Sequence, residues 1–191
     1  PQRPFVAILG GAKISGNIDV LTNLLPKVDK VIIGGGMAYT FFKARGLEIG
    51  RSLLEADKVA YAKDLLAQAG DKIILPVDCM ITDFFDFNAR KIGNLKEVSV
   101  EAIPADWESL DIGRKTIETF RGVLENAKTV IWNGPMGVFE IDETAKGTYA
   151  IADLLSRVTA KGAPTVIGGR ASAPAVNKAG VADKVSHVST G

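Results

Sequence analysis

Residues 129–140 read TVIWNGPMGVFE, and this stretch decides the fold. It begins with an apolar run that ends at Trp132, and a polar break at Asn133, Gly134 and Pro135 follows. This order is typical of a buried parallel strand that ends in a ligand-facing turn. Asn133 places an amide at the carboxyl end of the strand, and glycine lets a backbone or a ligand approach closely. The stretch therefore predicts a parallel sheet with a binding edge.

The same order of strand, glycine and helix repeats along the rest of the chain. We expect strands at residues 5–9, 31–33, 72–75, 79–82, 96–100, 130–132, 165–167 and 185–188. We expect helices at residues 15–25, 37–44, 55–69, 111–126, 142–158 and 172–178, and a loop or hairpin at 84–95. Such alternation indicates parallel strands joined by crossover helices. The predicted fold is α/β: a doubly wound, mostly parallel, Rossmann-like sheet with helices on both faces, formed as a single domain over residues 1–191.

Glycines follow several of the predicted strands. They stand at positions 10–11, 34–36, 134 and 168–169. In an open parallel sheet the carboxyl ends of the strands line one edge, where the helices that follow present their N-termini to anions. Glycine also ends strands in α/β folds that bind nothing there. The concentration of four glycine-bearing strand ends on one edge favours a phosphorylated or nucleotide ligand at that edge.

Composition excludes several classes of protein. The 23 Lys and Arg against 22 Asp and Glu leave a net charge of +1, which argues against a nucleic-acid partner. A single cysteine, Cys79, fits a reducing, cytoplasmic setting, and with the single His187 it argues against a zinc site. No apolar run reaches the roughly 18 residues of a membrane span. The abrupt start at Pro1 is typical of a domain boundary in a longer protein.

The residues 129–140 resemble the nucleotide-binding segment of the phosphoglycerate kinase family. Other segments follow in that family's order and spacing: AILGGAK at 7–13, IGGGMAYTF at 33–41, IPADW at 103–107, LDIG at 110–113 and DKVSHVSTG at 183–191. The resemblance covers the whole chain but only the C-terminal, nucleotide-binding domain of that family. It implies that an N-terminal domain, which holds the phosphoglycerate, belongs to the parent protein.

The resemblance implies that ADP or ATP binds at the strand ends. Nucleotide contacts are implied for Gly10, Gly11, Lys13, Gly34, Gly35, Asn133, Pro135, Glu140, Gly169 and Ser172. Lys13 would face the phosphates, and Glu140 would accept hydrogen bonds from the ribose hydroxyls. Each role has a plain alternative: a solvated lysine, a carboxylate that caps the helix near residue 142, and an Asn133 that satisfies its own turn.

The departures from the family pattern cluster at the catalytic edge. Asn17 stands where the family has a lysine that steadies the transferring phosphoryl group, and Asp19 stands where glycine is common. Phe84 replaces a usual cation, Arg170 replaces a glycine, and Ala171 replaces an aspartate that helps to place magnesium-nucleotide. We therefore expect magnesium dependence to be weak or lost, and we assign no catalytic residue and no metal ligands.

The sequence leaves two functions open. The first is the ADP- or ATP-binding half of a phosphoglycerate kinase, which transfers a phosphoryl group between 1,3-bisphosphoglycerate and ADP in glycolysis and is not catalytic alone. The second is an engineered or diverged scaffold whose strand-end pocket binds or converts another small anionic or aromatic molecule. Phe84 and Phe87 would supply an aromatic wall, or would pack against their own loop. The partner is a small molecule in both cases, and the oligomeric state stays open.

Overall fold

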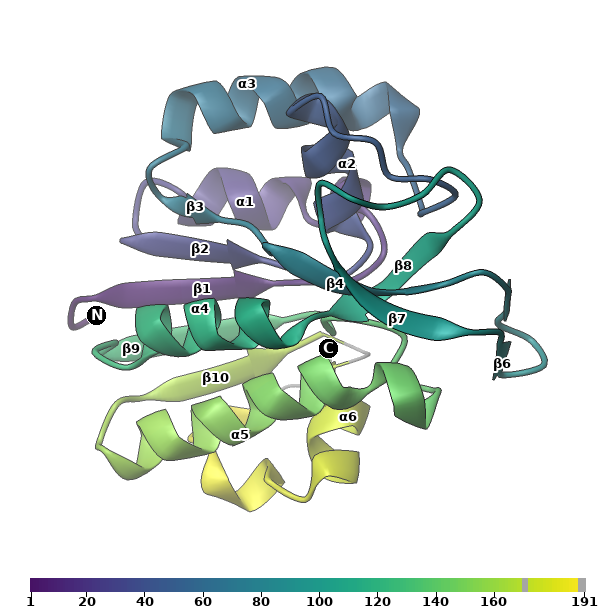
Figure 1. The fold of residues 1–191 in the computed structure, drawn as a ribbon. Helices are drawn as coiled ribbons and strands as arrows, with labels where there is room; N and C mark the ends of the chain where they lie inside the picture. The colour runs from purple at the N-terminus through teal and green to yellow at the C-terminus, as the bar shows by residue number, and fades with distance from the viewer. Residues whose placement is uncertain (170–171, 189–191) are drawn as a thin grey trace.

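A mostly parallel sheet organises the chain. The structure, a computed structural model, describes residues 1–169 and 172–188 (Figure 1). Its six-stranded sheet has the order β3-β2-β1-β9-β10-β11, and neighbouring strands are parallel. The strands are β1 (Phe5–Leu9), β2 (Lys30–Ile33), β3 (Ile73–Ile74), β9 (Thr129–Asn133), β10 (Thr165–Gly168) and β11 (His187–Val188). The predicted doubly wound α/β fold is confirmed.

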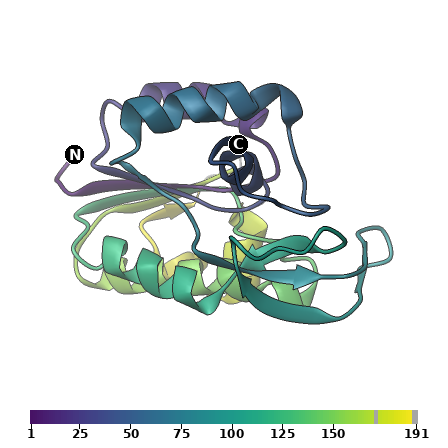
Figure 2. The same cartoon turned by 45° about the horizontal axis from the view of Figure 1, so that its top comes forward.

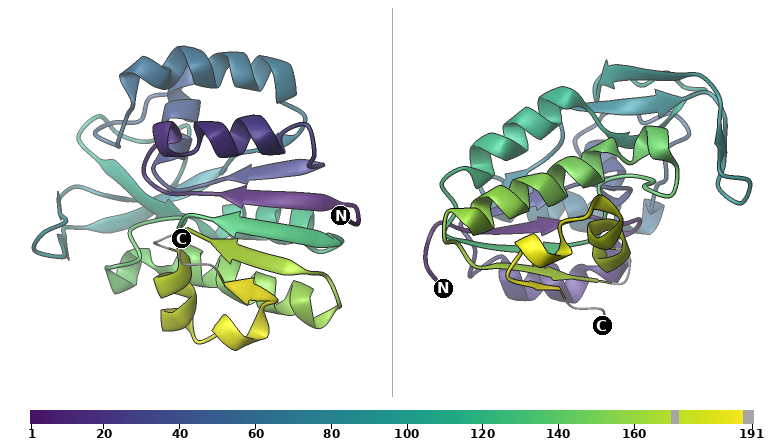
Figure 3. Two further views of the ribbon diagram at one scale, coloured as in Figure 1. Left: turned by 180° about the vertical axis from the view of Figure 1, so that it is seen from behind. Right: turned by 90° about the horizontal axis from the view of Figure 1, so that it is seen from below.

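Helices cover both faces of this sheet, as Figure 1 and the two views of Figure 3 show. One face carries α1 (Ile18–Leu24), α2 (Met37–Ala44) and α3 (Val59–Ala69), and the other carries α4 (Arg114–Leu124), α5 (Lys146–Ala160) and α6 (Ser172–Ala179). Short 3-10 turns are η1 (Ile14–Gly16), η2 (Ala56–Lys58), η3 (Asp142–Thr144) and η4 (Ala182–Lys184). Among the helices of the described residues, none is long and apolar enough to cross a membrane.

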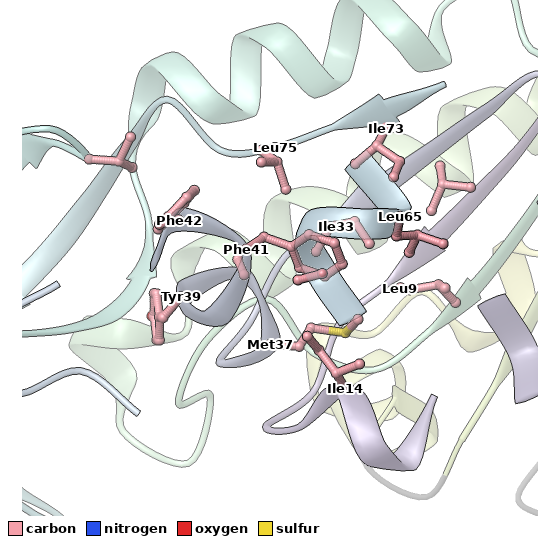
Figure 4. Packing of buried hydrophobic residues seen from close by; sticks show 14 of the residues in the cluster. Leu9, Ile14, Ile33, Met37, Tyr39, Phe41, Phe42, Leu65, Ile73 and Leu75 are labelled. Atoms are coloured by element: carbon pink, nitrogen blue, oxygen red, sulfur yellow. The ribbon is translucent and has the colours of Figure 1, made fainter. Parts of the chain in front are cut away.

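The apolar residues of each strand alternate between two cores because successive side chains of a strand point to opposite faces. On β1, Ala7 and Leu9 join the core under α1–α3, whereas Val6 and Ile8 join the core under α4–α6. Figure 4 shows aromatic and aliphatic side chains of the first core in contact around Phe41. The central strands β1 and β2 are thus buried on both faces, which explains their continuous hydrophobic runs, whereas Val166 on β10 stays 37% exposed.

A smaller sheet lies beyond the carboxyl ends of the parallel strands (Figure 2). Its order is β7-β4-β8, with β4 (Asp78–Thr82) antiparallel to both β7 (Leu95–Ser99) and β8 (Glu108–Ile112). The hairpin β5 (Phe85–Asp86) and β6 (Lys91–Ile92) extends from it and confirms the expected hairpin at residues 84–95. The strands that we expected near residues 79–82 and 96–100 exist, but they belong to this antiparallel sheet.

The helix predicted at residues 111–126 is wrong at its start. Asp111 and Ile112 belong to β8, and α4 begins at Arg114. The carboxylate that caps this helix comes from Asp78 on β4, which accepts hydrogen bonds from the backbone N–H groups of Lys115 (3.0 Å) and Thr116 (2.9 Å). The N-terminus of α4 is thus satisfied by a residue distant in sequence, not by the Asp-x-Gly that precedes it.

Candidate functional site

The loops after β1 and β9 meet at the point where the winding of the sheet reverses. β1 and β9 are neighbours, but the chain leaves β1 toward the α1 face and leaves β9 toward the α5 face. The backbone N–H of Gly10 donates to the carbonyl of Asn133 at 2.8 Å, and that of Gly11 donates to Pro135 at 2.9 Å. In sheets of this topology the crevice between two such loops is the usual ligand site.

Glycine is required where these loops pack against the loop after β2. Gly35 has a φ of +68°, and a Cβ placed there would lie 2.7 Å from both the Gly11 nitrogen and the Pro135 oxygen. Gly134 has a φ of +102°, and its Cβ would lie 2.3 Å from the carbonyl carbon of Gly10. Any larger residue would force the three loops apart, so the glycines hold the backbone edge of the site together.

A pocket of about 520 Å³ opens beside these loops. One wall is mainly backbone from the strand ends: Gly11, Ala12, Gly35, Gly36, Pro135, Gly137, Val138, Phe139 and Glu140. The other wall comes from α2, the segment that follows it, the hairpin and β8: Tyr39, Arg51, Leu53, Phe85, Phe87, Glu108, Ser109 and Leu110. The pocket therefore lies between the carboxyl edge of the parallel sheet and the small antiparallel sheet, a largely apolar slot with a few polar groups.

The hairpin supplies an aromatic wall. The rings of Phe85 and Phe87 meet edge to face with centroids 6.3 Å apart, and the Arg90 guanidinium lies 4.2 Å from the Phe87 centroid. Phe84 is 53% exposed, not far from the 44% of Phe87, but unlike Phe87 it does not line the pocket. Alternation along a strand places residues two apart on one face, and this signal could have distinguished Phe85 and Phe87 from Phe84.

A cation and a carboxylate face each other in the outer wall. Arg51 donates from Nη2 to the carbonyl of Asp83 at 2.7 Å, and the same nitrogen lies 4.0 Å from Oε2 of Glu108. The Glu108 side chain keeps 20% of its accessible surface, and this burial raises the pKa of its carboxyl, an effect that Arg51 opposes. Sequence reasoning missed both residues because residues 108–110 were assigned to no strand and the segment after α2 carries no motif.

Asp111 lies beneath the loop that forms the backbone wall. It accepts hydrogen bonds from the backbone of Gly147 (2.9 Å) and of Ile112 (2.8 Å), and burial raises its pKa to about 7. A Cβ on Gly137 would lie 2.6 Å from Oδ1 of Asp111, so the loop rests directly on this carboxyl. The neighbouring Leu110 carbonyl accepts from the Val138 N–H at 2.9 Å, which ties the loop to β8.

Asn17 lies behind the loop after β1, not in the pocket lining. Its Nδ2 donates to the carbonyls of Lys13 (3.2 Å) and Gly10 (3.4 Å). The Glu55 carboxylate accepts from the backbone N–H groups of Ile14 and Ser15 at the start of η1. Side-chain hydrogen bonds of Asn17 and of Glu55 therefore hold the backbone of the loop after β1.

The structure brings together only part of the predicted site residues. Those that line the pocket are Gly11, Gly35, Pro135, Glu140 and, of the two suggested phenylalanines, Phe87. Gly10 and Gly34 are buried beneath the loops, and Asn133 ends β9 outside the lining. Lys13 and Asp19 are exposed and outside the lining, Gly169 follows β10, and Ser172 begins α6. Arg170 and Ala171 lie outside the described residues. The described residues hold no group of three or more His, Cys, Asp or Glu placed to bind a metal ion.

Comparisons with known proteins agree with each other. A family model described as phosphoglycerate kinase matches residues 1–191. A chloroplastic phosphoglycerate kinase of Volvox carteri is 56% identical over the whole chain, which spans 41% of that relative. The phosphoglycerate kinase of Macrococcus caseolyticus is 55% identical, with 47% of its length spanned.

Solved structures show the same partial coverage. The phosphoglycerate kinase of Coxiella burnetii superposes with a TM-score of 0.92 at 36% identity, over all of this chain and 48% of that one. The enzyme of Pyrococcus horikoshii gives a TM-score of 0.83 at 30% identity, with 47% of its chain covered. The chain thus spans under half the length of the curated relatives it matches.

Proposed function

Because the chain belongs to the phosphoglycerate kinase family, we propose that residues 1–191 form the nucleotide-binding domain of such a kinase and bind ADP or ATP. In the whole protein this domain would present the nucleotide for phosphoryl exchange with 1,3-bisphosphoglycerate in glycolysis. The observation that carries the proposal is the pocket at the point where the winding reverses, between the loops after β1, β2 and β9 and the aromatic hairpin.

The two walls suit the parts of a nucleotide differently. We place the base in the apolar slot between the Pro135 loop and Phe85, because a flat ring gains contact area there without losing hydrogen bonds. Glu140, exposed at the rim, would accept hydrogen bonds from the ribose hydroxyls. The phosphates would then point toward Gly11 and the loop that leads to Lys13, where the exposed ammonium group of Lys13 favours anions.

A matched pair of variants tests this placement. Phe85→Ala removes a ring that lines the pocket, whereas Phe84→Ala removes the neighbouring ring that is 53% exposed and outside it. We expect calorimetry to show ADP binding to the unaltered chain and to Phe84→Ala, and binding about tenfold weaker or more for Phe85→Ala. Equal losses in the two variants, or no ADP binding by the unaltered chain, would contradict the proposal.

We further propose that this chain alone does not turn over 1,3-bisphosphoglycerate and ADP at a useful rate. Phosphoryl transfer depends on the positioning of two reactants, and the partner domain that would hold the acid substrate is not in these residues. A coupled assay for ATP formation should show no turnover by the chain alone. Ordinary kinase rates in that assay would overturn this prediction.

Magnesium should contribute little to nucleotide binding here. The side chain of Ala171 has no oxygen that could bind a metal ion, and the amide of Asn17 is engaged with the Gly10 and Lys13 carbonyls and carries no charge to offset phosphate. We expect ADP to bind more tightly, with magnesium present, to a variant that combines Asn17→Lys, Arg170→Gly and Ala171→Asp. Equal affinity of the two proteins in calorimetry would show that these positions do not matter.

One observation favours the second function, a pocket that has diverged, or has been engineered, for another ligand. Phe87 and Arg51 give the pocket an aromatic edge and a cation, which suit a small aromatic anion. Competition between such an anion and ADP on the unaltered chain separates the two functions, because only a diverged pocket would bind the anion and ignore ADP.

We place the protein in the cytoplasm, since its free Cys79 fits a reducing compartment, and cell fractionation tests this.

A further inference from the structure

We propose that Glu108 determines base specificity in this pocket, by accepting a hydrogen bond from an exocyclic amino group of the bound base. The inference rests on the proposed nucleotide site and adds to it the chemical feature that the site selects. Glu108 belongs to β8, the strand that the sequence motifs did not reveal, and its carboxylate lies in the outer wall of the pocket.

The Glu108 side chain is half-buried, and its carboxylate has no hydrogen-bond donor among the described residues. Its side chain keeps 20% of its accessible surface, and burial raises the pKa of the carboxyl. Across residues 1–169 and 172–188, no donor hydrogen-bonds to it, and Arg51 approaches only to 4.0 Å. The nearest Arg51 nitrogen donates to the Asp83 carbonyl at 2.7 Å instead, so the arginine supplies charge without a bond. A ligand that brings an N–H to this carboxylate would satisfy it.

The position of Glu108 along β8 assigns it to the base rather than to the sugar. Glu108 precedes Leu110 by two residues, and the Leu110 carbonyl accepts from Val138, which precedes Glu140 by two residues. Strand geometry separates the Cα atoms of Glu108 and Leu110 by roughly 7 Å. A nucleoside whose ribose lies at Glu140 would therefore extend its base toward Glu108, with Phe85 along the ring.

Hydrogen-bond chemistry then decides which base fits. An ionised carboxylate only accepts hydrogen bonds, so it attracts an exocyclic amino group and repels an exocyclic oxygen at the same position. Of the neighbouring wall residues, Phe85 and Leu110 can do neither, and the donor Arg51 directs its nearest nitrogen to the Asp83 carbonyl at 2.7 Å. A pocket that hydrogen-bonds a ligand group discriminates strongly against an analogue that lacks it, because a buried polar group is left unpaired.

The test compares ADP with inosine 5′-diphosphate, which carries an oxygen where ADP carries the amino group. We expect calorimetry on the unaltered chain to give about tenfold tighter binding of ADP. In Glu108→Gln, whose amide both donates and accepts, the preference should fall to about threefold or less. The matched control Glu118→Gln makes the same chemical change on the exposed face of α4, where Glu118 pairs with Arg121 at 3.5 Å, and should keep the full preference.

The outcomes separate this inference from the proposed function. If neither diphosphate binds the unaltered chain, the proposed nucleotide site itself is wrong. If ADP binds but inosine 5′-diphosphate binds equally well, or if Glu108→Gln keeps the full preference, the site stands and the role of Glu108 is refuted. If Glu108→Gln does not fold, which circular dichroism would show, equal binding of the two diphosphates by the unaltered chain still refutes the role of Glu108.

Discussion

The free energy of unfolding of the unaltered chain should fall as the pH rises toward neutrality, and Asp111→Asn should abolish most of this fall. Asp111 is 2% exposed, and its carboxyl accepts two backbone hydrogen bonds, one of them from Gly147 in the first turn of α5. Burial raises its pKa from 3.8 to about 7, although these hydrogen bonds and the charge of Lys146 oppose the rise. The folded chain thus holds a proton that the unfolded chain has already released.

The direction of the effect follows from this difference in proton binding. A carboxyl whose pKa is raised by folding contributes stability that is complete below its ordinary value, near pH 4, and is lost as the pH rises through about 7. Each pH unit in that window corresponds to about 1.4 kcal/mol, so the free energy of unfolding should fall by roughly 4 kcal/mol across it. Glu108, whose pKa burial also raises, acts in the same direction.

Urea unfolding followed by tryptophan fluorescence at several values between about pH 4 and pH 8 measures this effect. We expect the unaltered chain to lose stability with rising pH and Asp111→Asn to show only the smaller slope that Glu108 leaves. The matched control is Asp153→Asn, which changes an exposed carboxylate on α5 that pairs with Arg157 at 3.0 Å, and it should keep the slope of the unaltered chain. An equal slope in the chain and in Asp111→Asn would refute the reasoning.

The other predictions concern the glycine edge and the cap of α4. Gly35→Ala should cost about 2–3 kcal/mol of stability in urea unfolding, because its φ is +68° and a Cβ there would lie 2.7 Å from Gly11. Gly122→Ala, on α4 with open space around it, should instead gain up to about 1 kcal/mol, and a comparable loss there would contradict the steric argument. Asp78→Ala should cost about 2 kcal/mol, since it leaves the N–H groups of Lys115 and Thr116 without their acceptor; thermal unfolding unchanged by the substitution would show that water replaces the cap.

The parallel sheet could be predicted because its signals are local. Each of its longer strands is an apolar run, and each run is followed by glycine and then by a helix with its own apolar spacing. The spacing of apolar residues and the glycines that end each element depend only on neighbouring residues, so they can be recognised without tertiary information. The family motifs extended this to the place of the pocket, at the ends of β1, β2 and β9.

The small sheet could not be predicted in the same way. Only Gly113 separates the strand β8, with the sequence ESLDI, from the helix α4, and the acid that caps this helix is Asp78 of another strand. Its pairing with β4 depends on residues about 30 positions apart, and such contacts leave no local pattern. The helix boundary was therefore misplaced, and Glu108 was overlooked with it.

The sequence by itself determined the α/β architecture, its glycine-lined edge and its family, because these depend on short-range pattern and on residue identity. Only the tertiary structure decided which glycines line the pocket and which are buried beneath the loops, as Gly11 and Gly10 illustrate. It also decided that Phe85 lines the pocket while Phe84 faces outward, and that the Asp111 carboxyl is buried. Burial and charge environment arise from segments far apart in the chain, so they exist only once those segments have packed together.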